Sequence, residues 1–195
     1  MPTTGRTHDE YTALRATIRE RGTARVCVFA CGIAAWAAAT IATAALASTP
    51  VATLLPLLIL AAAFEAVFAL HVGVERIGRY LQVFHETDGS GGSSRSGGSG
   101  GSGADALIGW EHAAMAFGRP AGAATTDALF TVIFLLATLF NAAPALVADP
   151  ARVELVLVGG AHALFILRLV VARLSAGRQR AIDLKRFEEL KRAQG

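Results

Sequence analysis

Four ionisable side chains stand inside stretches of sequence that are otherwise almost free of charge. They are Glu65 and His71 in one stretch, and His162 and Arg168 in another. Ionisable groups are costly in an apolar setting, and those within membrane-spanning segments commonly carry protons or ions. These residue types therefore suggest a path for protons or small ions.

Glu65 and His162 form the pair that this interpretation favours most. At 1.5 Å per residue, Glu65 lies roughly 21 Å beyond Val51, and His162 lies roughly 17 Å beyond Ala151. These similar depths place both groups near the middle of a bilayer, where a carboxyl group is expected to be neutral or held by a partner. We predict a Glu65–His162 pair if the two stretches adjoin. The alternative is that both groups only hold helices together.

His71 and Arg168 are expected nearer the cytoplasmic edge, on a different face from Glu65. Each also has a plainer explanation than a role in an ion path. Arg168 can extend its charge toward the interface. His71 can pair with Glu75, one helical turn further on.

Two further arginines lie about three helical turns beyond the central pair, and so return to the same faces of their helices. Arg76 shares a stripe with Glu65, and Arg173 shares one with His162. We predict that Arg76 and Arg173 are charges at the cytoplasmic mouth of the path.

The elements that must position these residues are four apolar stretches, each about as long as a bilayer is thick. They are residues 26–48, 51–74, 128–147 and 153–172. The composition agrees, because 53% of the residues are hydrophobic and 17% are charged, whereas soluble domains carry about 25% charge. A spanning backbone must satisfy its own hydrogen bonds, so these stretches are predicted to be helices. The sequence predicts an all-α integral membrane protein and excludes a soluble catalytic domain, a disordered chain and a disulfide scaffold.

The connections and the basic residues predict the topology. Short links containing Pro50 and Pro150 join the first two and the last two stretches, which favours two antiparallel hairpins. All but two of the 18 Lys and Arg residues fall on one side, the exceptions being Arg152 and Arg168. That side is cytoplasmic by the positive-inside rule, so both termini face the cytoplasm. The first stretch is too long for a cleaved signal peptide, and we expect a multi-pass protein of a bacterial inner membrane.

The chain is predicted to have five segments. An amphipathic segment before the first hairpin is expected, with its helix broken at Gly22. It is predicted either to lie at the cytoplasmic interface or to cap the bundle as a soluble helix end. Helices 2 and 4 are expected to extend into the cytoplasm, and residues 58–76 can be aligned with 155–173 as an internal repeat. The segments are residues 1–25 (interfacial), 26–86 (first hairpin with its extension), 87–103 (flexible Gly/Ser linker), 104–124 (interfacial) and 125–195 (second hairpin with a C-terminal helix).

Other notable side chains have structural explanations. Cys27 and Cys31 share a helix face and are expected to pack, because a closed zinc site needs more ligands than two thiolates. Trp36 is expected to pack in the bundle, and Asn141 to form a hydrogen bond between helices. No nucleophile–base or metal-ligand pattern is present, so neither an enzyme nor a cofactor is expected. The basic residues fit topology and anionic lipids better than nucleic acid.

Two functions remain open from the sequence. The first is an oligomeric channel or transporter for protons or small ions that uses Glu65 and His162. The second is a structural or regulatory subunit of a membrane complex, with no transport of its own. Both functions predict that the chain lies in a lipid bilayer. Both also predict a protein partner, which is a further copy of the chain or another membrane subunit.

Overall fold

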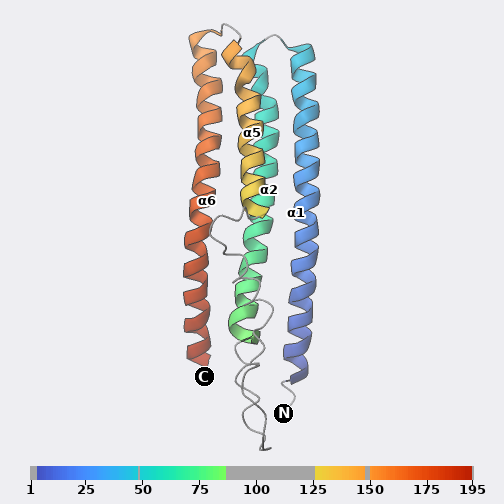
Figure 1. Ribbon diagram of the computed structural model, residues 1–195, viewed down its shortest axis with the longest axis vertical. Helices are drawn as coiled ribbons and strands as arrows, with labels where there is room; N and C mark the ends of the chain where they lie inside the picture. Colours follow the sequence, from blue (N-terminus) through green and yellow to red (C-terminus); the bar gives the residue numbers. More distant parts are fainter. Residues whose placement is uncertain (1–3, 48, 87–125, 148–149, 195) are drawn as a thin grey trace, which may run out of the picture. The chain divides into compact units, whose positions relative to one another are not determined.

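A computed structural model describes residues 4–47, 49–86, 126–147 and 150–194. Within these ranges every regular element is helical, which confirms the predicted all-α class (Figure 1). The elements are α1 (Thr4–Leu46), the short 3-10 helix η1 (Pro50–Thr53), α2 (Leu54–Leu81), the π-helical turn η2 (Gln82–Glu86), α5 (Thr126–Val147) and α6 (Arg152–Gln194).

Four helical segments among the described residues are long and apolar enough to cross a membrane. They are Asp9–Leu46, Pro50–Phe84, Ala128–Val147 and Arg152–Ala193, and each overlaps one of the four predicted stretches. The predicted linker (87–103) and the predicted interfacial segment (104–124) lie outside the described residues.

Helix lengths confirm two predictions and correct one. The predicted extensions of the second and fourth helices are present, since α2 continues to Leu81 and α6 to Gln194. The predicted break at Gly22 is wrong, because α1 runs without interruption from Thr4 to Leu46. A single glycine costs a helix only about 1 kcal/mol, and no turn-forming residues follow Gly22 to end the helix.

The chain divides into two compact units, which are described separately. The apolar unit consists of Arg21–His71 and Ala124–Gly177. The polar unit consists of Met1–Glu20, Val72–Ala123 and Arg178–Gly195. Both α2 and α6 contribute residues to each unit.

In the apolar unit, α1 and α5 run in one direction and α2 and α6 in the other, so that α2 and α6 are parallel (Figure 1). Residues from α2, α5 and α6 form the buried core, and partly buried residues of α1 such as Phe29, Ile33 and Trp36 pack against it. The core residues are Leu57, Leu60, Ala63, Phe64, Val67, Phe134, Ala137, Phe165, Leu169 and Ala172.

The polar unit is held together by aromatic rings and charges. Tyr80 stacks on Phe84 with ring centroids 4.7 Å apart, and Phe187 of α6 meets Tyr80 edge-on at 5.8 Å. The Tyr80 hydroxyl donates to Glu10 of α1 at 2.8 Å. Lys191 donates from Nζ to the carbonyl oxygen of Val83, 2.8 Å away in the π-helical turn. The parts of α1, α2 and α6 that belong to this unit are thus tied together.

Candidate functional site

Glu65 and Arg168 form an ion pair between α2 and α6 in the apolar unit. Arg168 donates from Nη2 to one carboxylate oxygen at 2.8 Å, and its Nε lies 2.8 Å from the other oxygen. Two parallel contacts of this kind are the strongest geometry available to an arginine and a carboxylate. The guanidinium also lies 5.3 Å from the ring centre of Phe68, close enough for a cation–π contact.

This ion pair is not enclosed by the chain. The Glu65 side chain is 49% exposed and that of Arg168 is 39% exposed. An isolated charge at the centre of a bilayer costs about 2.5–3.5 kcal/mol on insertion scales. The mutual neutralisation of the two charges reduces this cost, but the outward edge of the pair is left without a protein neighbour among the described residues.

His162 belongs to a separate, buried polar cluster. Its Nδ1 lies 2.8 Å from the carbonyl oxygen of Val158, and its Nε2 lies 3.0 Å from Nδ2 of Asn141. A carbonyl accepts and an amide nitrogen donates, so these contacts assign the hydrogen to Nδ1 and the lone pair to Nε2. Asn141 also donates to the carbonyl oxygen of Thr53 at 2.9 Å. The cluster therefore fixes one neutral form of the ring and joins α2, α5 and α6.

The predicted Glu65–His162 pair is wrong, because no hydrogen bond or ion pair joins these two described residues. Glu65 binds Arg168, and His162 binds Asn141. The reason is rotation about the helix axes. Phe64 is buried in the core and Glu65, the next residue, turns about 100° away from it. His162 is 4% exposed and lies on the inward face of α6, so equal depth did not bring the two side chains together.

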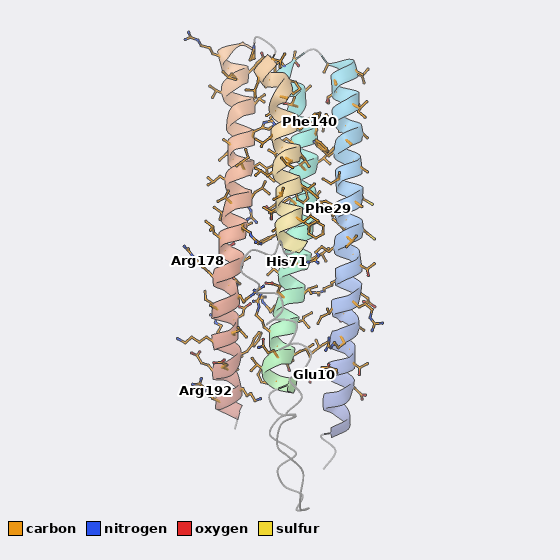
Figure 2. All side chains as sticks on the ribbon, viewed as in Figure 1. Glu10, Phe29, His71, Phe140, Arg178 and Arg192 are labelled. Atoms are coloured by element: carbon orange, nitrogen blue, oxygen red, sulfur yellow. The ribbon has the colours of Figure 1, made fainter. Side chains whose placement is uncertain are left out.

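His71 lies beside a small cavity in the apolar unit. Arg25 of α1 donates from Nη1 to Nδ1 of His71 at 3.0 Å, and Figure 2 labels His71 at its place on α2. The cavity measures about 40 Å³ and is lined by Arg25, His71, Arg173, Thr131 and apolar side chains, among them Phe64 and Phe134. This volume could hold a few water molecules. Of the residues predicted for the path, the cavity brings His71 and Arg173 together.

Arg76 lies in the polar unit, at the edge of a charge cluster that the sequence reasoning missed. Its Nε is 3.6 Å from Asp183 of α6. The centre of the cluster is Arg79, which is 1% exposed and binds both Asp183 and Glu75, the latter at 2.6 Å. Arg180 also binds Glu75. The Glu75–Arg79 spacing of one helical turn is a signal in the sequence that could have indicated part of this cluster.

The remaining side chains divide between confirmed and corrected predictions. Trp36 packs against the core and meets Phe140 edge-on at 6.1 Å, and Asn141 forms the predicted bond between helices. Cys27 and Cys31 are exposed, so the prediction that they pack within the chain is wrong. Among the described residues, no group of three or more His, Cys, Asp or Glu side chains could hold a metal ion.

Comparison with known proteins gives no relative from which a role could be transferred. No protein family, no curated protein and no solved structure matches the chain. The candidate site therefore rests on the geometry of the chain's own residues: an outward-facing Glu65–Arg168 pair, a buried His162–Asn141 cluster and a small cavity beside His71.

Proposed function

We propose that the chain is a four-span membrane protein with both termini in the cytoplasm, and that it serves as a structural or regulatory subunit of a membrane complex. Its four long apolar helices support insertion. So do the large apolar side chains on the outside of the apolar unit, such as Ile41 (71% exposed), Leu164 (68%) and Val153 (79%). Such a surface is unfavourable in water and suited to lipid. The clustering of arginines beyond one end of the spans supports the orientation.

The interior of the apolar unit favours the function of a subunit over that of a channel. Phe64 of α2 meets Phe134 of α5 at 5.4 Å and Phe165 of α6 at 5.9 Å, and Phe29 of α1 meets Phe134 at 5.7 Å. All four helices therefore contribute a ring to one cluster at the centre of the unit. Aromatic rings offer an ion no polar ligands to replace its water, so a single bundle of this kind is unsuited to conduct ions.

The polar unit gives such a subunit a defined surface for a partner outside the membrane. Its buried arginine, Arg79, binds Asp183 of α6 through Nη1 and Glu75 of α2 through Nη2, which holds α2 and α6 in one register. On the outside of α6, exposed charges form local pairs between Lys185 and Glu189 and between Arg192 and Glu188. Exposed charges of both signs can be matched by a partner of complementary charge, which would give the contact its specificity.

Transport is the second candidate, and one observation favours it. The Glu65–Arg168 pair faces outward from the bundle, so several copies of the chain could enclose a polar path between them. In that case Glu65 would line the path, and the aromatic interior of each bundle would be irrelevant to conduction.

Flux through reconstituted protein separates the two functions. The purified chain is placed in liposomes that contain a pH-sensitive dye, and proton and potassium flux are measured. We expect flux no greater than in protein-free liposomes, for the parent and for Glu65→Gln alike. Flux in the parent that is lost in Glu65→Gln, but kept in the matched control Glu189→Gln on the exposed face of α6, would establish transport and overturn the subunit proposal.

A further inference from the structure

One lateral face of the apolar unit carries a shallow groove between α2 and α6. The groove measures about 400 Å³ and is lined by Leu54, Leu57, Leu58 and Ala61 of α2 and by Ala161, Leu164 and Phe165 of α6. Its lining is apolar, and the alanines at its base would let another helix approach closely.

The ion pair lies on the same face, one helical turn beyond the groove. Glu65 follows Ala61 on α2 by one turn, and Arg168 follows Leu164 on α6 by one turn. Both charged side chains are half-exposed at this point. The face therefore combines an apolar groove with one negative and one positive charge at the same depth.

The sequence of this face is complementary to itself. Glu65 and Arg168 lie side by side and are 103 positions apart in the chain. Because α2 and α6 are parallel, the same offset pairs Leu58 with Ala161 and Ala61 with Leu164 at successive depths. Each pair joins a large residue to a small one, and the exposed leucines project strongly, with Leu58 67% and Leu164 68% exposed.

We infer that this α2–α6 face binds a second copy of the chain. A twofold axis along the membrane normal keeps every residue at its depth and places α2 of one copy opposite α6 of the other. Leu58 then meets Ala161 of the other copy, Ala61 meets Leu164, and Glu65 meets Arg168. Two ion pairs become a closed ring of four alternating charges, and the exposed edges of both pairs are covered. The inference rests on the membrane placement proposed above and names the partner of this face.

Disulfide crosslinking tests the arrangement without disturbing the charges. In a background carrying Cys27→Ser and Cys31→Ser, a copy with Ala61→Cys is mixed in liposomes with a differently tagged copy with Leu164→Cys. A mild oxidant should give a crosslinked dimer that contains both tags. The matched control replaces Ala61→Cys by Leu136→Cys, an exposed position on α5 (58% exposed), and should give at least about fivefold less product, which corresponds to about 1 kcal/mol of preference. Equal crosslinking in the two mixtures would overturn the inference.

A charge-mixing experiment tests whether the ion pairs act between copies. Glu65→Arg gives a face with two positive charges, and Arg168→Glu gives a face with two negative charges. Each variant alone should dimerise at least about fivefold more weakly than the parent, whereas the two expressed together should form a heterodimer recovered through both tags. If the pair acts only within one chain, mixing rescues nothing, and the inference is wrong.

Failure of this inference can be told apart from failure of the proposed function. If the purified parent stays monomeric in liposomes but enters a larger complex in native membranes, another membrane protein covers the face and the second-copy assignment is overturned. The subunit proposal would stand in that case. Flux that depends on Glu65 would overturn the subunit proposal while leaving a crosslinked dimer intact.

Discussion

Gly32 of α1 lies directly against Ala63 of α2, where the two helices are closer than two side chains would allow. A Cβ atom added at position 32 would lie closer to the Cβ of Ala63 than two non-bonded carbon atoms can approach. Ala63 is itself buried, with 9% exposed. The missing side chain at position 32 thus sets how closely α1 packs on the core.

The substitution Gly32→Ala should therefore destabilise the apolar unit. Alanine favours a helix over glycine by about 1 kcal/mol, but the clash forces α1 away from α2, and overpacking typically costs about 1–3 kcal/mol. We expect a lower thermal midpoint in detergent micelles. The matched control is Gly22→Ala in the same helix, where nothing lies within 4 Å, and which should raise the midpoint. A rise for both variants would contradict the close contact.

The Glu65–Arg168 pair predicts a large coupling between two substitutions. Glu65→Gln alone leaves the Arg168 charge without its carboxylate and should destabilise the bundle by about 1–3 kcal/mol. Adding Arg168→Met removes the unpaired charge and should restore most of the lost stability. Thermal unfolding in lipid nanodiscs measures the four states of this cycle. Additive effects of the two substitutions would show that the pair contributes nothing.

The buried amide of Asn141 predicts a smaller loss. Asn141→Leu leaves Nε2 of His162 without a donor and removes the side-chain donor to the Thr53 carbonyl oxygen, at a cost of about 1–2 kcal/mol. The double variant Asn141→Leu, His162→Leu should recover part of this loss, because the unpaired Nε2 of His162 is then removed as well. The same nanodisc unfolding assay applies, and a double variant that is less stable than either single one would argue against the cluster.

The sequence predicted the helices well because apolar length alone determines them. Residues 51–74 and 153–172 have few charges, and Pro56, their only proline, lies near a helix start. α5 continues through Pro144 to Val147. A proline this close to a helix end removes little of the backbone hydrogen bonding of the helix. Gly22 does not end α1, because the helix-forming residues on both sides outweigh the cost of one glycine.

The site was predicted less well because depth along a helix says nothing about rotation. Depth placed Glu65 and His162 at one level, whereas packing turned His162 inward and Glu65 outward. The buried faces could have been found from spacing, since Val158, His162, Phe165 and Leu169 recur at helical intervals. The partner of Arg79 could not be found in this way, because Asp183 is more than a hundred positions away and only the packing of α2 on α6 brings it close.

The buried arginine of the polar unit predicts a strong local effect. Arg79→Met leaves the carboxylates of Asp183 and Glu75 short of a partner, and breaking a buried pair typically costs about 3–5 kcal/mol. The matched control is Arg76→Met, because the Arg76 side chain is 54% exposed and should contribute less than about 1 kcal/mol.

Hydrogen exchange measures which part of the molecule loses stability in Arg79→Met. Amide exchange in α6 beyond Arg178 should become much faster in Arg79→Met and should hardly change in Arg76→Met. Equal exchange in the two variants would mean that the charge cluster does not hold α6 in place.

Single-cysteine labelling most directly tests the proposed arrangement of four spans with both termini in the cytoplasm. In intact cells expressing the chain with Cys27→Ser and Cys31→Ser, a membrane-impermeant maleimide should label Ala151→Cys, at the start of the last span. It should label Gln179→Cys, in the arginine-rich part of α6, only after the cells are permeabilised. Labelling of Gln179→Cys in intact cells, with Ala151→Cys protected, would contradict the account.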